Sequence, residues 1–240
     1  MNKTAFINRL LAKPVSGADI EKLSFAAIDR EAEMAHFQPG EWEIARRMIH
    51  ATGDVELARD IRVSPDAVRA GVLALREKRP IYADSNMIRA GLSLARLRNV
   101  NADYSREYVH CHVADDDVAE SARATGLPRS LFAVRKAAVE LQGGIVLFGN
   151  APVGLLELNR MIIEEGLRPA LVLAMPVGFV HVLESKEEFL SLGVPHVAVI
   201  GRRGGSALAV SALHALCTLA AQLSNDTCNL PMKESDGGTT

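Results

Sequence analysis

The sequence is poor in cysteine and has no long apolar run, and both shortages restrict the class of protein. Its three cysteines are Cys111, Cys217 and Cys228, and no two of them are spaced as C-x-x-C. Neither a disulfide framework nor a thiolate zinc site is indicated, and a reducing cytoplasm fits best. No stretch of about 18 apolar residues and no cleavable N-terminal signal occurs, so we expect no membrane partner.

An excess of either sign of charge is also missing. Lysine and arginine together number 27 against 29 aspartates and glutamates, for a formal net charge of −2. A surface that attracts polyanions overall is therefore not expected, and nucleic acid is not predicted as a partner. Hydrophobic residues make up 48% of the 240 residues, which is enough for a sizeable core without metal or disulfide cross-links.

Several motifs that would identify a reaction class are absent. The chain contains no G-x-S-x-G, no H-E-x-x-H and no convincing nucleophilic cysteine. The glycines after the last predicted strand have neither dinucleotide-fingerprint spacing nor a Gly-Lys-Ser/Thr ending. The sequence therefore does not favour a serine hydrolase, a zinc protease, a cysteine hydrolase or a nucleotide-binding loop.

What the chain does contain is a regular alternation of short apolar runs and helical patterns. Residues 17–79 lack a strand-like run and predict helices, one of them N-capped by Ser64-Pro65-Asp66. Five strand-like runs follow, each with a turn signal and a helical pattern after it, at 81–83, 108–113, 145–148, 170–174 and 196–200. We predict one α/β domain over 19–223, with a mainly parallel five-stranded sheet, helices on both faces and a helical N-terminal region. Residues 1–18 are predicted to form an N-terminal tail and 224–240 a flexible C-terminal tail.

The segments that follow the predicted strands are candidates for a binding site, because ligands of such sheets bind beyond the carboxyl ends of the strands. They are Asp84–Met87, Gly149–Pro152, Met175–Phe179 and Gly201–Ser206. Glycine, proline and helix starts would bring backbone N–H groups to this edge, so we expect an anionic ligand. Gly201–Ser206 is interpreted as an anion cradle, although a tight strand-to-helix turn would use the same glycines.

Other polar residues each allow a functional and a plain structural interpretation. His50 ends a helical segment and could carry a proton near neutral pH, or it could simply complement the helix dipole. His110 and His112 share one face of a strand and could bind a metal, but no third ligand is visible. A packed strand before an acid-capped helix is the better account of these two histidines, so no metal site is predicted.

Seven segments, in order between about residues 20 and 215, match the motifs of one known family. They are Ser24–Ile28 with Glu31-Ala32, Ala45–Asp54, Pro80–Asp84 with Met87 and Gly91, Arg129-Ser130, Phe148–Pro152, Met175–Val180 with Glu184–Lys186, and Gly193–Pro195 with Gly201–Ala207. Together they resemble the precorrin-8X methylmutase family, also called cobalt-precorrin-8 methylmutase. Seven ordered motifs are far more specific than any single one.

The resemblance implies an isomerase that moves a methyl group from ring carbon 11 to ring carbon 12 of a tetrapyrrole. The product would be hydrogenobyrinic acid or its cobalt counterpart, and no organic cofactor would be consumed. His50 matches the family's proton-managing histidine, and general acid catalysis suits such a group. The resemblance also implies a homodimer that holds the corrinoid where the subunits meet.

A broad apolar ring edged by carboxylates needs an apolar floor and a rim of amides and cations. The resemblance implies Ser24 and Arg129 as substrate-binding residues, and we expect the others to be Asp84, Ser130, Asn150, Lys186, Arg202, Gly204, Gly205 and Ser206. Arg129 and Lys186 could instead belong to a salt-bridged surface. The sequence leaves open whether the substrate carries cobalt.

The chain departs from the family pattern at Val153, where threonine is more usual, and at His181 and Leu183, where small residues are usual. These changes could alter the pocket wall, and His181 could offer a second proton carrier. Two other functions stay open: a corrinoid-binding carrier without turnover, and an unrelated α/β enzyme that acts on a phosphorylated metabolite.

Overall fold

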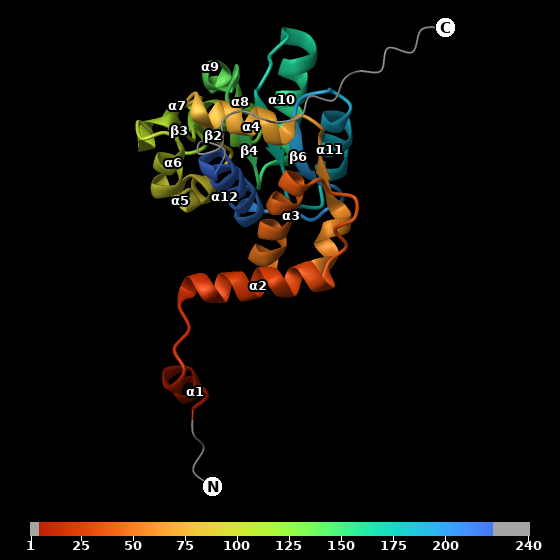
Figure 1. The fold of residues 1–240 in the computed structure, drawn as a ribbon. Helices are drawn as coiled ribbons and strands as arrows, with labels where there is room; N and C mark the ends of the chain where they lie inside the picture. Colours follow the sequence, from red (N-terminus) through yellow and green to blue (C-terminus); the bar gives the residue numbers. More distant parts are fainter. Residues whose placement is uncertain (1–4, 223–240) are drawn as a thin grey trace, which may run out of the picture.

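The computed structural model describes residues 5–222 and shows a six-stranded sheet with helices on both faces (Figure 1). The strand order is β1-β6-β5-β4-β2-β3, and every neighbouring pair is parallel except β1 and β6. The strands are β1 (Ile61–Val63), β2 (Ile81–Ala83), β3 (Val109–His110), β4 (Ile145–Phe148), β5 (Leu171–Ala174) and β6 (His196–Val199). The predicted fold class is therefore confirmed: α/β, mainly parallel and covered on both faces.

The helices account for most of the remaining described chain. They are α1 (Ile7–Ala12), α2 (Gly17–Glu31), α3 (Pro39–Thr52), α4 (Ala67–Arg76), α5 (Asn86–Gly91), α6 (Leu94–Val100), α7 (Asp116–Thr125), α8 (Arg129–Lys136), α9 (Ala138–Leu141), α10 (Pro152–Glu165), α11 (Val182–Leu190) and α12 (Ser206–Gln222). Two 3₁₀ turns, Val55–Asp60 and Arg106–Tyr108, precede β1 and β3. Within the part of the chain that the structure describes, no helix is both long and apolar enough to span a membrane.

The sheet has one strand more than the sequence predicts. The strand β1 lies in the 17–79 segment that was predicted to be helical, and it pairs antiparallel with β6, Ile61 opposite Val199. Its three residues are too few to give a periodic signal, and the exposed Arg62 interrupts the apolar run. The predicted N-cap at Ser64 is also wrong. The Ser64 hydroxyl accepts the N–H of His196 on β6, and α4 begins only at Ala67.

Alternate residues of each central strand point into two separate cores. On one face Ile145, Leu147, Leu171 and Leu173 pack with α3, α4, α5, α6 and α12. On the other face Val146, Phe148 and Val172 pack with α8, α9, α10 and α11. A sheet buried on both sides explains why β2, β4 and β5 are continuous apolar runs.

Two segments at the ends of the chain were predicted to be tails. The N-terminal one contains α1, which has no buried residue and stands apart from the body of the molecule (Figure 1). The helix α2 links it to the body by packing against α3. The C-terminal segment, 224–240, lies outside the described residues.

Candidate functional site

The ends of β2 and β4 are joined by one buried carboxylate. Asp84 follows β2 directly and is only 2% exposed. Its Oδ2 accepts the backbone N–H groups of Gly149, Asn150 and Ala151 at 3.1, 2.7 and 2.8 Å. Burial raises the pKa of this carboxyl, and the three N–H donors oppose that shift. From its buried position, Asp84 therefore fixes the backbone conformation of the turn after β4.

The N-terminus of α12 is packed against the ends of β4 and β5 by close backbone contacts. A Cβ atom built on Gly149 would lie 2.7 Å from the backbone nitrogen of Ser206, and one on Gly204 would overlap the Met175 carbonyl oxygen. The N–H of Gly205 donates to that same carbonyl at 2.9 Å. The Ser206 hydroxyl lies 3.2 Å from the Ser85 hydroxyl after β2. Four strand ends thus meet at the start of one helix, as predicted for the ligand-binding edge.

A pocket of about 400 Å³ opens beside this helix start, between α3, α5 and α12. Its lining residues are Arg47, His50, Ala51, Met87, Gly91, Ser206, Ala207, Val210, Ser211 and His214. His50 is exposed in the last turn of α3, where its imidazole meets the edge of the Phe25 ring at a centroid distance of 5.3 Å. The pocket therefore combines a solvent-accessible histidine with apolar walls and the amide end of a helix.

The helix α3 is positioned by strong signals at both ends. Gln38 and Glu41 form a capping box, Pro39 occupies the first turn, and Gly53 ends the helix in the left-handed conformation at φ 67°. The buried stripe of α3, which includes Ile44, Met48 and Ile49, faces α12 and the core. His50 and Arg47 are left on the pocket side, where Arg47 pairs with Glu21 of α2 at 3.0 Å.

His214 is a second histidine of the pocket, and it was missed in the sequence. Its Nε2 accepts the backbone N–H of Ser93 at 3.0 Å, so the proton of the neutral ring resides on Nδ1. Burial, with help from Arg96 and Arg47, lowers the pKa of His214 to about 4. The ring is therefore a neutral donor near pH 7. Ser206, Val210 and His214 are spaced four residues apart, and this periodicity on a predicted helix is the signal that could have revealed it.

The remaining predicted residues lie outside this pocket. Asn150, Arg129 and Arg202 are exposed, and Arg129 begins α8. Ser130 lies beside α10, since a Cβ on Gly154 would be 3.5 Å from the Ser130 Cβ. The Arg202 guanidinium stacks over the exposed Phe179 ring at 5.7 Å. Ser24 on α2 donates to the Ile20 carbonyl at 2.8 Å, next to the Phe25 that contacts His50.

Comparisons with known proteins decide the family. The model of the precorrin-8X methylmutase family matches residues 19–219. This chain belongs to the precorrin-8X methylmutase family. The cobalt-precorrin-8 methylmutase of Leptospira interrogans is 38% identical over 86% of this chain and 95% of its own length. The precorrin-8X methylmutase of Pseudomonas aeruginosa is 40% identical over 84% of this chain and 95% of its own.

A solved structure of the methylmutase family has the same fold. The crystal structure of precorrin-8X methylmutase from Thermus thermophilus superposes with a TM-score of 0.78 at 44% identity. The match covers 88% of this chain and all of that one. The alternative of an unrelated α/β enzyme for phosphorylated metabolites is thereby set aside.

The residues at which this methylmutase-family chain departs from the family pattern do not line the described pocket. Val153 is half-buried in the first turn of α10. His181 is exposed at the start of α11 and adopts a left-handed conformation, φ 58°. Glycine adopts this conformation without strain, so the backbone at this position would suit a glycine better than a histidine.

Lys186 supports the turn after β6 from inside the protein. It is 2% exposed, and its Nζ donates to the carbonyl oxygens of Gly201 and Arg203 at 2.9 and 2.7 Å. Arg203 in turn pairs with Asp54 and Asp60 at 3.3 and 3.4 Å. The predicted cation Lys186 therefore holds the Gly201–Ser206 turn in place, as Asp84 holds the turn after β4.

The buried amine predicts a pH dependence of stability. Burial lowers the pKa of Lys186 to about 8, below the value near 10.4 in an unfolded chain. The unfolded chain binds more protons between pH 8 and 10.5, so stability rises with pH across that window. We expect wild type to gain roughly 2–4 kcal/mol relative to Lys186→Met between these pH values. Urea unfolding at several pH values measures this, and a constant difference would contradict it.

Proposed function

We propose that the chain catalyses the methyl shift from ring carbon 11 to ring carbon 12 of precorrin-8X or cobalt-precorrin-8. The observation that carries the proposal is the pocket in which His50 lies opposite the N-terminus of α12, in a chain of the methylmutase family. Substrate and product are isomers, so no co-reactant is required. A cytoplasmic setting is proposed as well, on the basis of the low cysteine content.

The pocket residues can supply a proton for the shift and hydrogen-bond donors for the substrate. The C11–methyl bond breaks as the C12–methyl bond forms, and His50 would deliver the proton that polarises the macrocycle and take it back afterwards. The neutral His214 would donate its Nδ1–H to the ring or to a carboxylate at its edge. The backbone amides at the start of α12 would bind a substrate carboxylate, since an N-terminal helix end favours negative charge.

Positioning would supply a further part of the catalysis. The apolar walls provided by Ala51, Met87, Ala207 and Val210 suit the flat face of the ring. Asp84 and Lys186 would act as positioning residues, because their polar atoms are directed at backbone groups of the turns. A fixed edge holds the ring in the geometry from which the methyl migrates.

A visible absorption time course tests the proposal. The shift rearranges the conjugated system, so purified protein at substoichiometric concentration should convert the spectrum of precorrin-8X or of its cobalt form to that of the product. The faster substrate indicates whether cobalt is already present. A stable bound spectrum that never progresses would instead favour a carrier, and the absence of any binding would contradict both.

The exposed Arg129 gives a prediction about substrate affinity. It is exposed at the start of α8, and we propose that its guanidinium pairs with a carboxylate at the edge of the substrate ring. Arg129→Ala should weaken ring binding about 10-fold, with a smaller change in turnover at saturation. The matched control is Arg123→Ala, another exposed arginine on the neighbouring α7. An unchanged dissociation constant in R129A would remove Arg129 from the rim.

A homodimer is also part of the proposal, with α1 and α2 as the contact. Exposed apolar side chains gather on these helices: Phe6, Ile7, Leu10, Leu11, Ile20 and Leu23. Large apolar side chains exposed in such number are typical of protein interfaces, and a second copy of the chain is the partner we propose. Light scattering should give twice the 25.9 kDa chain mass. The double variant Leu10→Glu, Leu11→Glu should be monomeric, and Leu73→Glu on α4 should stay dimeric.

A further inference from the structure

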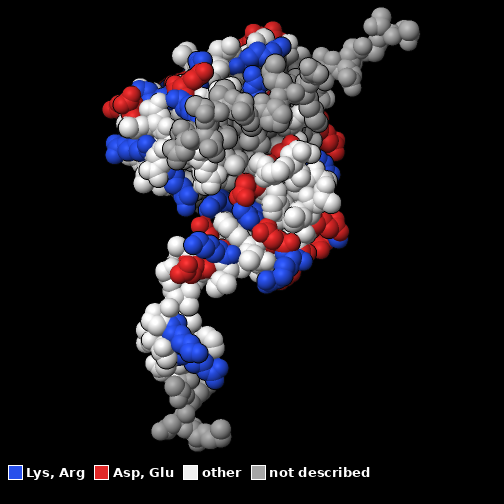
Figure 2. All heavy atoms as spheres, in the orientation of Figure 1, with Lys and Arg blue, Asp and Glu red and all other residues white. Residues whose placement is uncertain are grey.

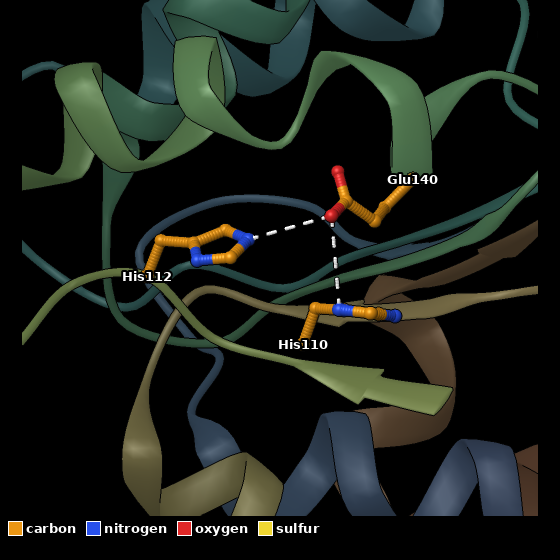
Figure 3. A group of neighbouring side chains, drawn as sticks. All are labelled: His110, His112 and Glu140. Atoms are coloured by element: carbon orange, nitrogen blue, oxygen red, sulfur yellow. Dashed lines mark ion pairs between the residues drawn. The ribbon is translucent and has the colours of Figure 1, made fainter. Parts of the chain in front are cut away.

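Three metal-ligating side chains converge at the outer edge of the sheet, away from the pocket. His110 ends β3, His112 follows two residues later, and Glu140 reaches them from α9 (Figure 3). Glu140 Oε1 lies 3.7 Å from His110 Nδ1 and 3.7 Å from His112 Nε2. All three ligand atoms lie within 4.8 Å of one another. Cys111, between the histidines, packs against the opposite core.

The side chains of this cluster do not satisfy one another's polar atoms by hydrogen bonds. A distance of 3.7 Å is too long for an N–H···O hydrogen bond, which is usually 2.7–3.2 Å. His112 Nε2 is buried and has no hydrogen-bond partner among the described residues. Buried polar atoms in folded proteins nearly always have a partner, so this orphaned nitrogen calls for a ligand.

The other ring nitrogen of His112 is fixed by a carboxylate. His112 Nδ1 lies 2.9 Å from Asp115 Oδ2, and the same carboxylate is held by Lys136 Nζ at 2.7 Å. A carboxylate accepts only from a protonated nitrogen, so Nδ1 carries the hydrogen and the neutral ring presents a lone pair at Nε2. A carboxylate behind a histidine, with the far nitrogen free, is the arrangement that orients metal-bound histidines.

We propose that His110 Nδ1, His112 Nε2 and Glu140 Oε1 bind one divalent transition-metal ion of the zinc class. Ligand atoms about 2.0–2.2 Å from a tetrahedral ion lie roughly 3.3–3.6 Å apart, close to the 3.7 Å separations here. Two imidazoles and one carboxylate suit zinc better than calcium or magnesium, which prefer oxygen alone. The side chains are 18–26% exposed, so the fourth position is open to water.

The site lies on the face of the sheet opposite the substrate pocket. His110 pairs with Tyr82, whose side chain packs in the core under α8, α9 and α10. The pocket is lined from α3, α5 and α12 on the other side. The edge strand β3 has only two residues and pairs with β2 alone. A metal would fasten this short strand to α9, and binding to the folded state alone would stabilise it.

Metal titration of the untagged, full-length chain tests the proposal. Co²⁺ bound at a tetrahedral site should give visible absorption bands that saturate at one equivalent per chain and that Zn²⁺ displaces. His112→Ala and Glu140→Gln should each lose at least 10-fold in affinity, and Asp115→Asn should lose 10–100-fold because the carboxylate that orients His112 is removed. Zn²⁺ should raise the Tm of the wild type but not that of E140Q.

A histidine outside the cluster supplies the matched control. His36 is exposed near Glu33 and Glu41, which makes it the obvious place for adventitious metal. His36→Ala should bind metal like the wild type. The proposal is overturned if the wild type binds no stoichiometric metal, or if binding survives E140Q and H112A. Glu140→Gln keeps the shape of the side chain, so the test holds even if H112A fails to fold.

Discussion

Replacement of His50 by alanine is expected to lower the rate of the methyl shift by about 10²–10⁴-fold, the range for loss of a general acid. The imidazole lies in the pocket wall, is exposed, and makes a T-shaped contact with the Phe25 ring. The change leaves in place Met87, Val210 and the N-terminus of α12, which we propose bind the ring. The dissociation constant for the substrate, measured from the spectrum of the bound ring, should therefore change less than about 3-fold.

Two further histidine variants make this result specific. His36→Ala removes an exposed histidine far from the pocket and should turn over like the wild type. His181→Ala tests the second proton carrier that the sequence allowed, and we expect near-normal turnover because His181 does not line the pocket. Normal turnover in H50A would show that the proton comes from another group, and a large loss in H181A would identify that group.

The second large effect is expected from one methyl group at Gly204. A Cβ there would overlap the carbonyl oxygen of Met175, which is a backbone atom of a buried segment and cannot rotate away. The N-terminus of α12 must then separate from the end of β5, and the Gly205 N–H loses its bond to Met175. We expect Gly204→Ala to cost about 2–3 kcal/mol of unfolding free energy and most of the turnover.

Gly17 offers the matched control for that variant. A Cβ on Gly17 would have nothing within 4 Å, and its backbone conformation suits any residue. Gly17→Ala should leave stability the same or slightly higher, since alanine is the better helix former. Urea unfolding gives both numbers. Equal stability of G204A and wild type would mean that the helix start and the strand end are not rigidly packed.

Strands buried on both faces were the most predictable part of the fold. The runs 81–83 and 145–148 match β2 and β4 to the residue, because every side chain in them is apolar and buried. The strand β1 could not be predicted in this way, since its pairing with β6 comes from a long-range contact and not from its own pattern. Mixed charge on the surface agrees with the composition: Figure 2 shows basic and acidic side chains interspersed on the face in view.

For the site, the sequence predicted which segments meet but not what each side chain does there. Asp84 and Lys186 were expected to contact the substrate, and they prove to be buried under the turns, which only the fold determines. His214 was not predicted because it lies eight residues after Ser206, where the turn interpreted as an anion cradle ends. Glu140 was equally invisible, since 28 residues separate it from His112 and only the packing of α9 on β2 brings them together.

The helix α12 both lines the pocket and fills part of the core, two roles that many proteins give to separate segments. One side of its N-terminal half, from Ser206 to His214, lines the pocket, and its other sides are buried among α3, α4, α5 and α6. Because α12 packs on four helices of the core, we expect the amides of its central turns to exchange with deuterium only when the whole domain opens. The N-terminus of α12, which we propose binds a substrate carboxylate, would then be as rigid as the domain itself. The helix α3 on the opposite side of the pocket packs on α12 through its buried stripe, so both of these walls are held by the same core.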